Sequence, residues 1–214
     1  MQLHYFPGNA SMVPHMLLEE LGLPFELHYV DRALDAQKSA DYLKLNPNGL
    51  IPVLVDGDLV LYETAAICLH LADSHPQAGL APPLGSSERA QLYKRLMWLS
   101  NTMQATSLLY FYPERWLDAG NAAGAAQIKA HAEAQIVGML EQLDAELAAH
   151  GKDWLLGDRY SVLDPYALVL CRWTRGFARP ARSWARLGPY LQRVLARPAV
   201  QRVLATEQIA APFV

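Results

Sequence analysis

The sequence predicts an α/β domain with the element order βαβαββα, followed by an all-helical domain. Short alternating or β-branched runs, separated by helical patterns, fill the first third of the chain. Beyond residue 87 no strand pattern is found, and a stretch rich in Pro, Gly and Ser lies at the junction. We therefore expect an α/β domain over residues 1–79, a linker over 80–87 and an all-helical domain over 88–214.

Turn and cap residues delimit the first elements. Leu3–Phe6 predicts a strand, which a Pro-Gly-Asn turn ends. Ser11 is a candidate N-cap for a helix that runs to Leu21, where Gly and Pro follow within three residues. Phe25–Val30 alternates apolar and polar residues and predicts the second strand, and Asp35–Leu45 predicts a polar, weakly helical crossover.

A hairpin with a proline at its start follows. Asn46–Gly49 has strong turn chemistry and leads into an apolar, β-branched run. Pro52 interrupts that run, and Ile51-Pro52 is a candidate cis peptide because X-Pro bonds adopt cis at modest cost. Asp56-Gly57 predicts the hairpin turn, and a helix is expected over Ala65–Asp73.

Helical periodicity dominates the remainder. Ser161–Asp164 matches a capping box, with Ser161 as N-cap and Asp164 in place of the usual Glu or Gln. The apolar tail, Ile209–Val214, is expected to dock against the protein. Helices are predicted over Ser87–Phe111, Ala125–His150, a segment that includes Leu168–Cys171, Ala181–Leu187, Pro189–Ala196 and Pro198–Leu204.

Charge and composition narrow the class of protein. Residues 1–79 hold three Lys/Arg and ten Asp/Glu, a balance of −7, whereas the remainder has a balance of +4. No dense basic stripe interleaves with aromatic residues, which argues against nucleic-acid binding. No apolar run approaches the roughly 18 residues that span a bilayer, and the start lacks the pattern of a signal peptide. Two distant cysteines fit a reducing compartment, and no histidine has metal-ligand spacing, so we expect a cytoplasmic protein without a metal site.

These residues resemble the cytosolic glutathione transferase family over essentially the full length, with a thioredoxin-like first domain. The opening and the Ser-Met-Val-Pro-His segment are most similar to the bacterial beta-type branch. That branch has a cysteine before the serine, where this chain has Ala10, so disulfide chemistry with glutathione is not expected there. Thr106–Leu108 stands where the branch has a histidine-lysine pair. Four segments carry the resemblance: Tyr5–Ser11, Asn46–Leu54, Tyr62–Ile67 and Ser161–Asp164.

The resemblance implies a binding site for glutathione, γ-Glu-Cys-Gly. The strand after Pro52 would pair with the cysteinyl segment through the backbone of Val53. The γ-Glu carboxylate would lie at the helix N-terminus near Thr64, and Glu63 would accept the γ-Glu ammonium. The implied glutathione-binding residues are Lys38, Ile51, Pro52, Val53, Glu63 and Thr64.

A catalytic site must also stabilise the glutathione thiolate. Ser11 is the favoured hydrogen-bond donor, Tyr5 is a rival and Asn9 is a third candidate. Ser11 could instead be only a helix cap, and Tyr5 only a core residue. The electrophile is expected between the domains, where the aromatic stretch of the long helix would line its pocket through Met103, Tyr110, Phe111 and Tyr112.

The predicted function is therefore glutathione transfer to a hydrophobic electrophile, by a homodimer. Two alternatives stay open. The chain could be a transferase-like binding or regulatory protein without catalysis, or a glutathione-dependent peroxidase or reductase. The intact Pro52-Val53 and Glu63-Thr64 elements argue against the non-catalytic alternative, because a pure scaffold needs no ligand edge.

Overall fold

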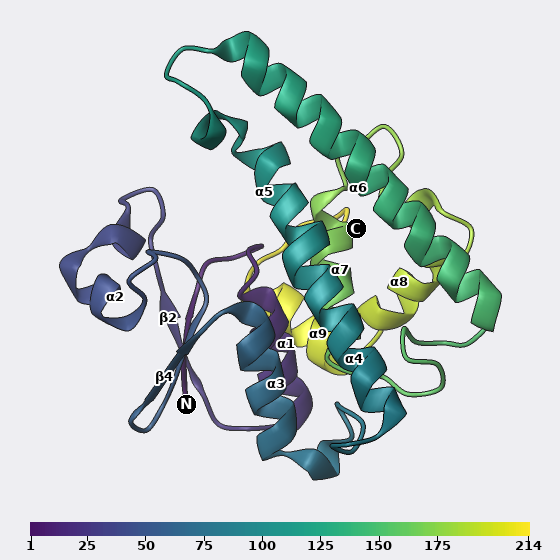
Figure 1. Ribbon diagram of the computed structural model, residues 1–214. Coiled ribbons are helices and arrows are strands. Elements are labelled where there is room, and N and C mark those ends of the chain that lie inside the picture. Colours follow the sequence, from purple (N-terminus) through teal and green to yellow (C-terminus); the bar gives the residue numbers. More distant parts are fainter.

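Four short strands form one mixed sheet in the computed structural model, which describes residues 1–214 (Figure 1). The order in the sheet is β2-β1-β3-β4, with β1 parallel to β2 and antiparallel to β3. β3 and β4 form the predicted antiparallel hairpin. The bounds are β1 Gln2–Tyr5, β2 Glu26–Tyr29, β3 Val53–Asp56 and β4 Leu59–Tyr62.

Helices cover both faces of this sheet. Figure 1 shows α2 (Ala40–Leu45) on one side and α1 (Met12–Leu21) with α3 (Thr64–Ser74) on the other. Under α2, Tyr42 packs with Val30 and Val53 in a small apolar cluster of its own. The element order βαβαββα and the thioredoxin-like class are therefore confirmed. A short helix, η1 (Ala36–Lys38), precedes α2.

The rest of the chain is helical, as predicted. The long helix expected over 87–111 consists of α4 (Ser87–Trp98), a π-helical segment η3 (Leu99–Gln104) and α5 (Ala105–Phe111). α6 packs along α5, and α7 lies at the centre of the helical part, buried from its first residue to Arg172. The remaining bounds are η2 Pro76–Ala78, η4 Pro113–Trp116, α6 Ala122–His150, α7 Leu163–Trp173, η5 Ala181–Ser183, α8 Leu187–Leu195 and α9 Pro198–Thr206.

One predicted helix is wrong. Over residues 181–187 only the three-residue η5 forms, and Leu187 begins α8 instead.

The predicted capping box at Ser161–Asp164 is present, but its hydrogen bonds differ from the usual pattern. The Asp164 carboxylate accepts the Ser161 N–H at 2.7 Å, while the Ser161 hydroxyl oxygen accepts from Leu163 rather than from Asp164. Asp164 also accepts from Tyr190, so this buried carboxylate ties the start of α7 to α8.

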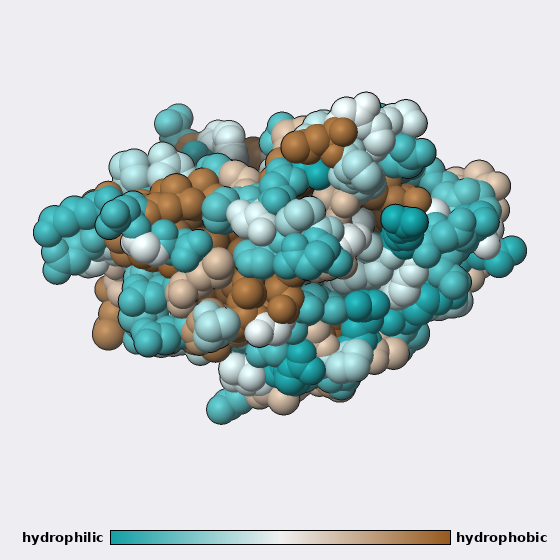
Figure 2. All heavy atoms as spheres, turned by 90° about the horizontal axis from the view of Figure 1, so that it is seen from below, coloured by the Kyte–Doolittle hydropathy of each residue, from teal (hydrophilic) through white to brown (hydrophobic).

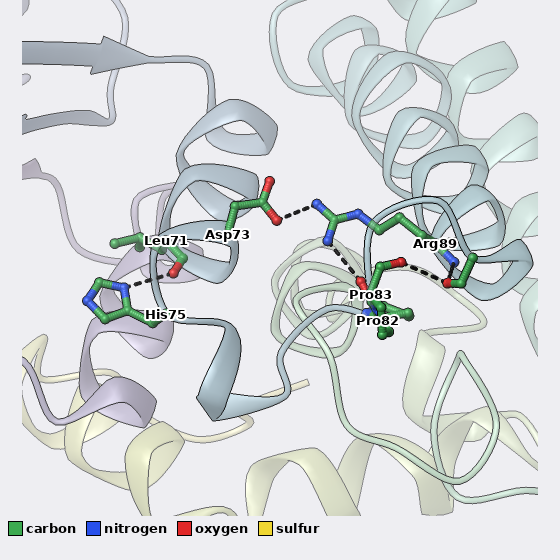
Figure 3. A network of polar contacts seen from close by, with 7 residues as sticks. Leu71, Asp73, His75, Pro82, Pro83 and Arg89 are labelled. Atoms are coloured by element: carbon green, nitrogen blue, oxygen red, sulfur yellow. Dashed lines mark hydrogen bonds and ion pairs between the residues drawn. The ribbon is translucent and has the colours of Figure 1, made fainter.

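α1 joins the two parts, because it packs against α3 on the sheet side and against α7 and α9 on the helical side. Figure 3 shows a second connection, in which Arg89 of α4 donates to Asp73 at the end of α3 and to the carbonyl of Pro82. The C-terminal tail docks as predicted, since Arg172 donates to the carbonyls of Pro212 and Phe213.

On the face seen in Figure 2, brown patches are separated by polar residues. No helix of the structure combines the length and apolar character that crossing a membrane requires.

Candidate functional site

Two adjoining cavities lie between the sheet and the helical part. The larger has a volume of about 440 Å³ and the smaller about 180 Å³. Both are lined by Asn9, Arg32, Leu108, Tyr112 and Trp173. The larger is also lined by Ala10, Gln37, Lys38, Asn48, Gly49, Leu50, Ile51, Gln104 and Arg115, and the smaller by Phe6, Pro7, Gly8, Phe111 and Arg175.

A third cavity of about 350 Å³ lies elsewhere, beside the connection between the two parts. It is lined by residues such as Pro82, Asp158 and Tyr160, and it contains none of the predicted site residues. The chemistry that the sequence predicts is therefore concentrated in the two adjoining cavities.

Residues 6–11, which we call the first turn, border both cavities, and Asn9 lines both of them. Within it, Ser11 is fully buried, donates its hydroxyl hydrogen to the Phe6 carbonyl at 3.1 Å and accepts the Phe6 N–H at 3.2 Å. Ser11 lines neither cavity and its side chain does not cap α1. The Ser11 hydroxyl is therefore bonded to the backbone of Phe6, which weighs against its predicted role as thiol donor.

The two rival donors differ in position. Tyr5 packs against His15 and Tyr29 and lines neither cavity; burial, with the charges of Glu207 and Tyr29, raises the pKa of its phenol. Asn9 lines both cavities, and its Oδ1 accepts the Ala10 N–H at 2.6 Å. That bond fixes the amide and leaves its NH₂ group as an unpaired donor.

The first turn is held from two helices of the other part. Glu207, just after α9, accepts the Gly8 N–H at 3.0 Å and bonds the buried His15 at 2.8 Å. Trp173, the last residue of α7, donates its indole N–H to the Gly8 carbonyl at 3.1 Å. Both backbone groups of Gly8 are thus fixed by residues more than 160 positions away.

The free backbone edge is at Ile51, not at Val53. The Ile51-Pro52 bond is cis, as predicted. Val53 is fully buried in β3 between His4 of β1 and Tyr62 of β4, so its backbone faces sheet neighbours. Ile51 lines the larger cavity, and its N–H and C=O make no hydrogen bond within the chain. The sheet pairing begins after Pro52, which is buried beneath this edge.

Glu63 and Thr64 stand at the start of α3. Glu63 is exposed and has a φ of +71°, a conformation that side-chain-bearing residues rarely adopt. Thr64 is buried and α3 has no side-chain cap, so its first N–H groups have no side-chain acceptor. Neither residue lines a cavity wall. Burial raises the pKa of Tyr166, whose hydroxyl donates to Gln104 on the wall of the larger cavity; the charges of Cys68 and, less, of Glu63 add to this shift.

Lys38 lines the larger cavity, as Ile51 does. Its ammonium pairs with Asp35 at 3.0 Å, and both side chains are largely exposed. An exposed pair of this kind is weak, so the ammonium is free to exchange partners.

Of the residues predicted to line the electrophile pocket, some line a cavity and others are packed in the core. Phe111 lines the smaller cavity and is 42% exposed. Met103 is fully buried in the core, and Tyr110 packs against Phe177 at 4.7 Å between ring centres. Neither Met103 nor Tyr110 lines either of the two adjoining cavities, unlike Phe111 and Tyr112. The π-helical η3 breaks the regular spacing from which this helix face is predicted.

Several wall residues have no signal in the sequence. Arg32 follows β2 and donates to the Tyr112 hydroxyl at 2.8 Å, so it bridges the two parts across the cavities. Its guanidinium lies over the rings of Phe6, at 5.4 Å, and Tyr112, at 5.9 Å. Trp173 and Arg175 come from the end of α7, more than 140 residues further along the chain. A lone arginine after a strand, or a tryptophan at a helix end, belongs to no motif by which it could be found.

Comparison with known proteins gives one consistent result. Residues 10–74 match the family model described as the N-terminal domain of glutathione S-transferase. A glutathione S-transferase of Xanthomonas campestris pv. campestris is 32% identical over 209 residues, covering 97% of this chain and 98% of that protein. Glutathione S-transferase 3 of Zea mays is 32% identical over 220 residues, covering 99% and 96%.

Solved structures agree. A sphingomonad glutathione S-transferase in complex with glutathione superposes with a TM-score of 0.83 at 34% identity, covering 98% of this chain and all of that one. A beta-class glutathione S-transferase of Sphingomonas chungbukensis gives a TM-score of 0.84 at 32% identity, covering 98% of this chain and 100% of that one.

Proposed function

This chain belongs to the glutathione S-transferase family, and we propose on that basis that it transfers a hydrophobic electrophile to the thiol of glutathione. The observation that carries the proposal is the unpaired backbone of Ile51, which faces a cavity of about 440 Å³ beside Asn9. Cavities of about 300–1,000 Å³ hold small organic ligands. An unpaired N–H and C=O on one extended residue suit a peptide-like ligand, which can add as a strand.

We propose that glutathione lies along the larger cavity. Its cysteinyl segment would pair with Ile51, and its γ-Glu group would reach the start of α3. There the unpaired N–H groups near Thr64 would bind the carboxylate, and Glu63 would accept the ammonium. The strained backbone of Glu63 supports a functional role, because such strain persists mainly where a site requires it. Lys38, which also lines the larger cavity, would bind the glycyl carboxylate.

We further propose that the Asn9 side-chain NH₂ donates to the glutathione sulfur. Of the three donors considered, only Asn9 lines the cavities and has an unpaired N–H. The N-terminus of α1 follows directly, and its partial positive charge would favour a thiolate over a thiol. Hydrogen bonding to the thiolate lowers the thiol pKa without any general base.

Binding and thiolate formation test this proposal separately. Calorimetric titration with glutathione is expected to show binding, and ultraviolet absorbance is expected to show bound thiolate near neutral pH. Asn9→Ala should lose thiolate absorbance and lower kcat/KM by about 10–100-fold, the effect of one hydrogen bond to a charged group.

Ser11→Ala is the matched control. It should lower the Tm, because it removes the Phe6 contacts, and retain thiolate absorbance. Absence of binding at millimolar glutathione would contradict the transferase proposal. Unchanged thiolate absorbance in Asn9→Ala would contradict only the role of Asn9.

We also propose, as the resemblance implies, that the protein is a cytoplasmic homodimer with domains over 1–79 and 88–214. Sedimentation of the purified chain would give the oligomeric state directly. The peroxidase, reductase and non-catalytic alternatives are tested by peroxide and disulfide substrates in the same coupled assay.

A further inference from the structure

Three arginines surround the two cavities without a carboxylate partner. Arg32, Arg115 and Arg175, which we call the arginine rim, take part in no salt bridge. No aspartate or glutamate lines either cavity. Five other arginines of the chain do pair with carboxylates: Arg89, Arg95, Arg193, Arg197 and Arg202.

We propose that the electrophile taken by the smaller cavity is an aromatic anion, a one-ring compound that carries a carboxylate or sulfonate away from its reacting carbon. This inference rests on the proposed glutathione conjugation, whose electrophile it specifies. It follows from a combination of aromatic walls and unpaired cations in one small space.

The walls of the smaller cavity suit a single aromatic ring. Its volume is about 180 Å³, and a protein cavity of about 150 Å³ is known to accept benzene. Phe6, Phe111 and Trp173 supply flat apolar surfaces, with the Phe111 and Trp173 rings edge to face at 6.1 Å.

Each guanidinium of the arginine rim contacts a neighbouring residue and keeps N–H donors that could bind an anion. Arg32 is held by the Tyr112 hydroxyl and by its ring contacts, which leaves other guanidinium N–H groups available. The Arg115 guanidinium also lies over the Tyr112 ring, 4.1 Å from the ring centre. Arg175 donates one N–H to the Arg172 carbonyl at 3.2 Å and has further donors unpaired.

The nearby acids are engaged by other partners, since the Glu207 carboxylate bonds the Gly8 N–H and His15. Asp31, next to Arg32, accepts the N–H of Ala33 at 2.9 Å instead. Burial, and after it the charge of Arg175, lower the pKa of Arg172, whereas the charge of Glu207 raises it. A site with one sign of charge and apolar walls concentrates ligands of the opposite charge.

The carboxylates of glutathione do not account for the whole rim. The unpaired edge of Ile51 and the cation Lys38 line only the larger cavity, where glutathione is proposed to lie. Arg175 lines only the smaller cavity, together with Phe6 and Phe111. Arg175 is therefore the residue whose charge is left for the second substrate.

A matched pair of substrates tests the inference: a chlorodinitrobenzoate with its carboxylate para to chlorine, and the corresponding uncharged benzamide. In both, the thiolate attacks the chlorine-bearing carbon, a C–S bond forms, and chloride leaves with the electron pair of the C–Cl bond. The thiol proton passes to solvent. Each rate is divided by the uncatalysed rate with glutathione at the same pH, which removes the difference in intrinsic reactivity.

The wild type should favour the benzoate over the benzamide by about tenfold or more in this normalised kcat/KM, the size expected for hydrogen bonds to a charged group. Arg175→Gln should lower that ratio about tenfold. Arg179→Gln is the control and should leave the ratio unchanged, because Arg179 stacks on Trp184 outside both cavities. Added salt should lower the wild-type ratio.

Binding of the unreactive dinitrobenzoate and dinitrobenzamide, measured by calorimetry, provides a second readout that needs no turnover. Tighter binding of the benzoate, weakened in Arg175→Gln, is the expected result. Equal affinity, or a normalised ratio of one or less while the benzamide is turned over, would overturn the inference and leave the transferase proposal intact. Failure to bind glutathione together with benzoate binding would overturn the transferase proposal alone.

Discussion

The first turn and the arginine rim border the same cavities but differ in what their polar groups contact. In the first turn, the polar groups of Ser11, Gly8 and the Asn9 carbonyl are bonded within the chain. In the rim, three guanidinium groups have no carboxylate partner, whereas five of the other ten arginines have one. Polar groups that are satisfied internally hold the structure, whereas groups left unpaired at a cavity are available to a ligand. The Asn9 NH₂ and the Ile51 backbone belong with the rim by this criterion.

The largest effect is expected on the first-turn side, from Glu207→Ala. The change leaves the Gly8 N–H and buried His15 without their shared partner. Removing one member of a buried pair typically lowers the free energy of unfolding by about 3–5 kcal/mol, and urea denaturation would measure it. Glu19→Ala is the control, because the Glu19–Arg202 pair between the same helices is more exposed and should contribute under about 1 kcal/mol. Equal losses for the two variants would contradict the distinction.

Glu63 is expected to show a smaller effect, and on binding rather than stability. Glu63→Gln should raise the Kd for glutathione about 10–100-fold, since a charged hydrogen bond to the ammonium is lost. Glu63→Gly should weaken binding similarly and leave the free energy of unfolding unchanged or raise it by about 1 kcal/mol, because glycine adopts a φ of +71° without strain. A destabilised Glu63→Gly would show instead that Glu63 supports the fold.

The division between these regions explains what the sequence could predict. Turn residues, caps and periodicity are local, so they predicted the element order βαβαββα, the cis Ile51-Pro52 bond and the docked tail. Local pattern could not show that sheet pairing begins after Pro52, which moves the free edge from Val53 to Ile51. That depends on the register with β1.

The rest of the site is built from contacts between distant segments. Arg32 meets Tyr112 across 80 positions, and Trp173 meets Gly8 across 165. Such contacts follow from the packing of the two parts against α1, which no window of sequence contains. The hydrogen bond from Ser11 to Phe6 joins residues only five positions apart. It still could not be predicted, because the direction of the hydroxyl depends on the rotamer that the buried site allows.

Trp173 has both a structural and a cavity-lining position, since it donates to the Gly8 carbonyl and also forms a cavity wall. Trp173→Phe keeps an aromatic wall and removes the donor to the Gly8 carbonyl. We expect a loss of about 1 kcal/mol in the free energy of unfolding, typical for one neutral hydrogen bond, with a fall in kcat as the first turn loosens. Thermal unfolding and steady-state kinetics measure the two effects. A loss above about 3 kcal/mol would mean that the indole is mainly a core residue.

The smallest effect is expected from Arg115→Gln, and it tests the comparison most directly. Arg115 is exposed and contacts only the Tyr112 ring among aromatic groups, so its removal should change the free energy of unfolding by under about 1 kcal/mol. Arg89→Gln is the matched change at a buried arginine, which donates to Asp73 and Pro82 (Figure 3) and should lose about 2–3 kcal/mol or more. If Arg115→Gln proved as destabilising as Arg89→Gln, its charge would be serving the fold. A near-zero change in stability with a fall in affinity for an anionic ligand would place it with the groups that the chain leaves unpaired for binding.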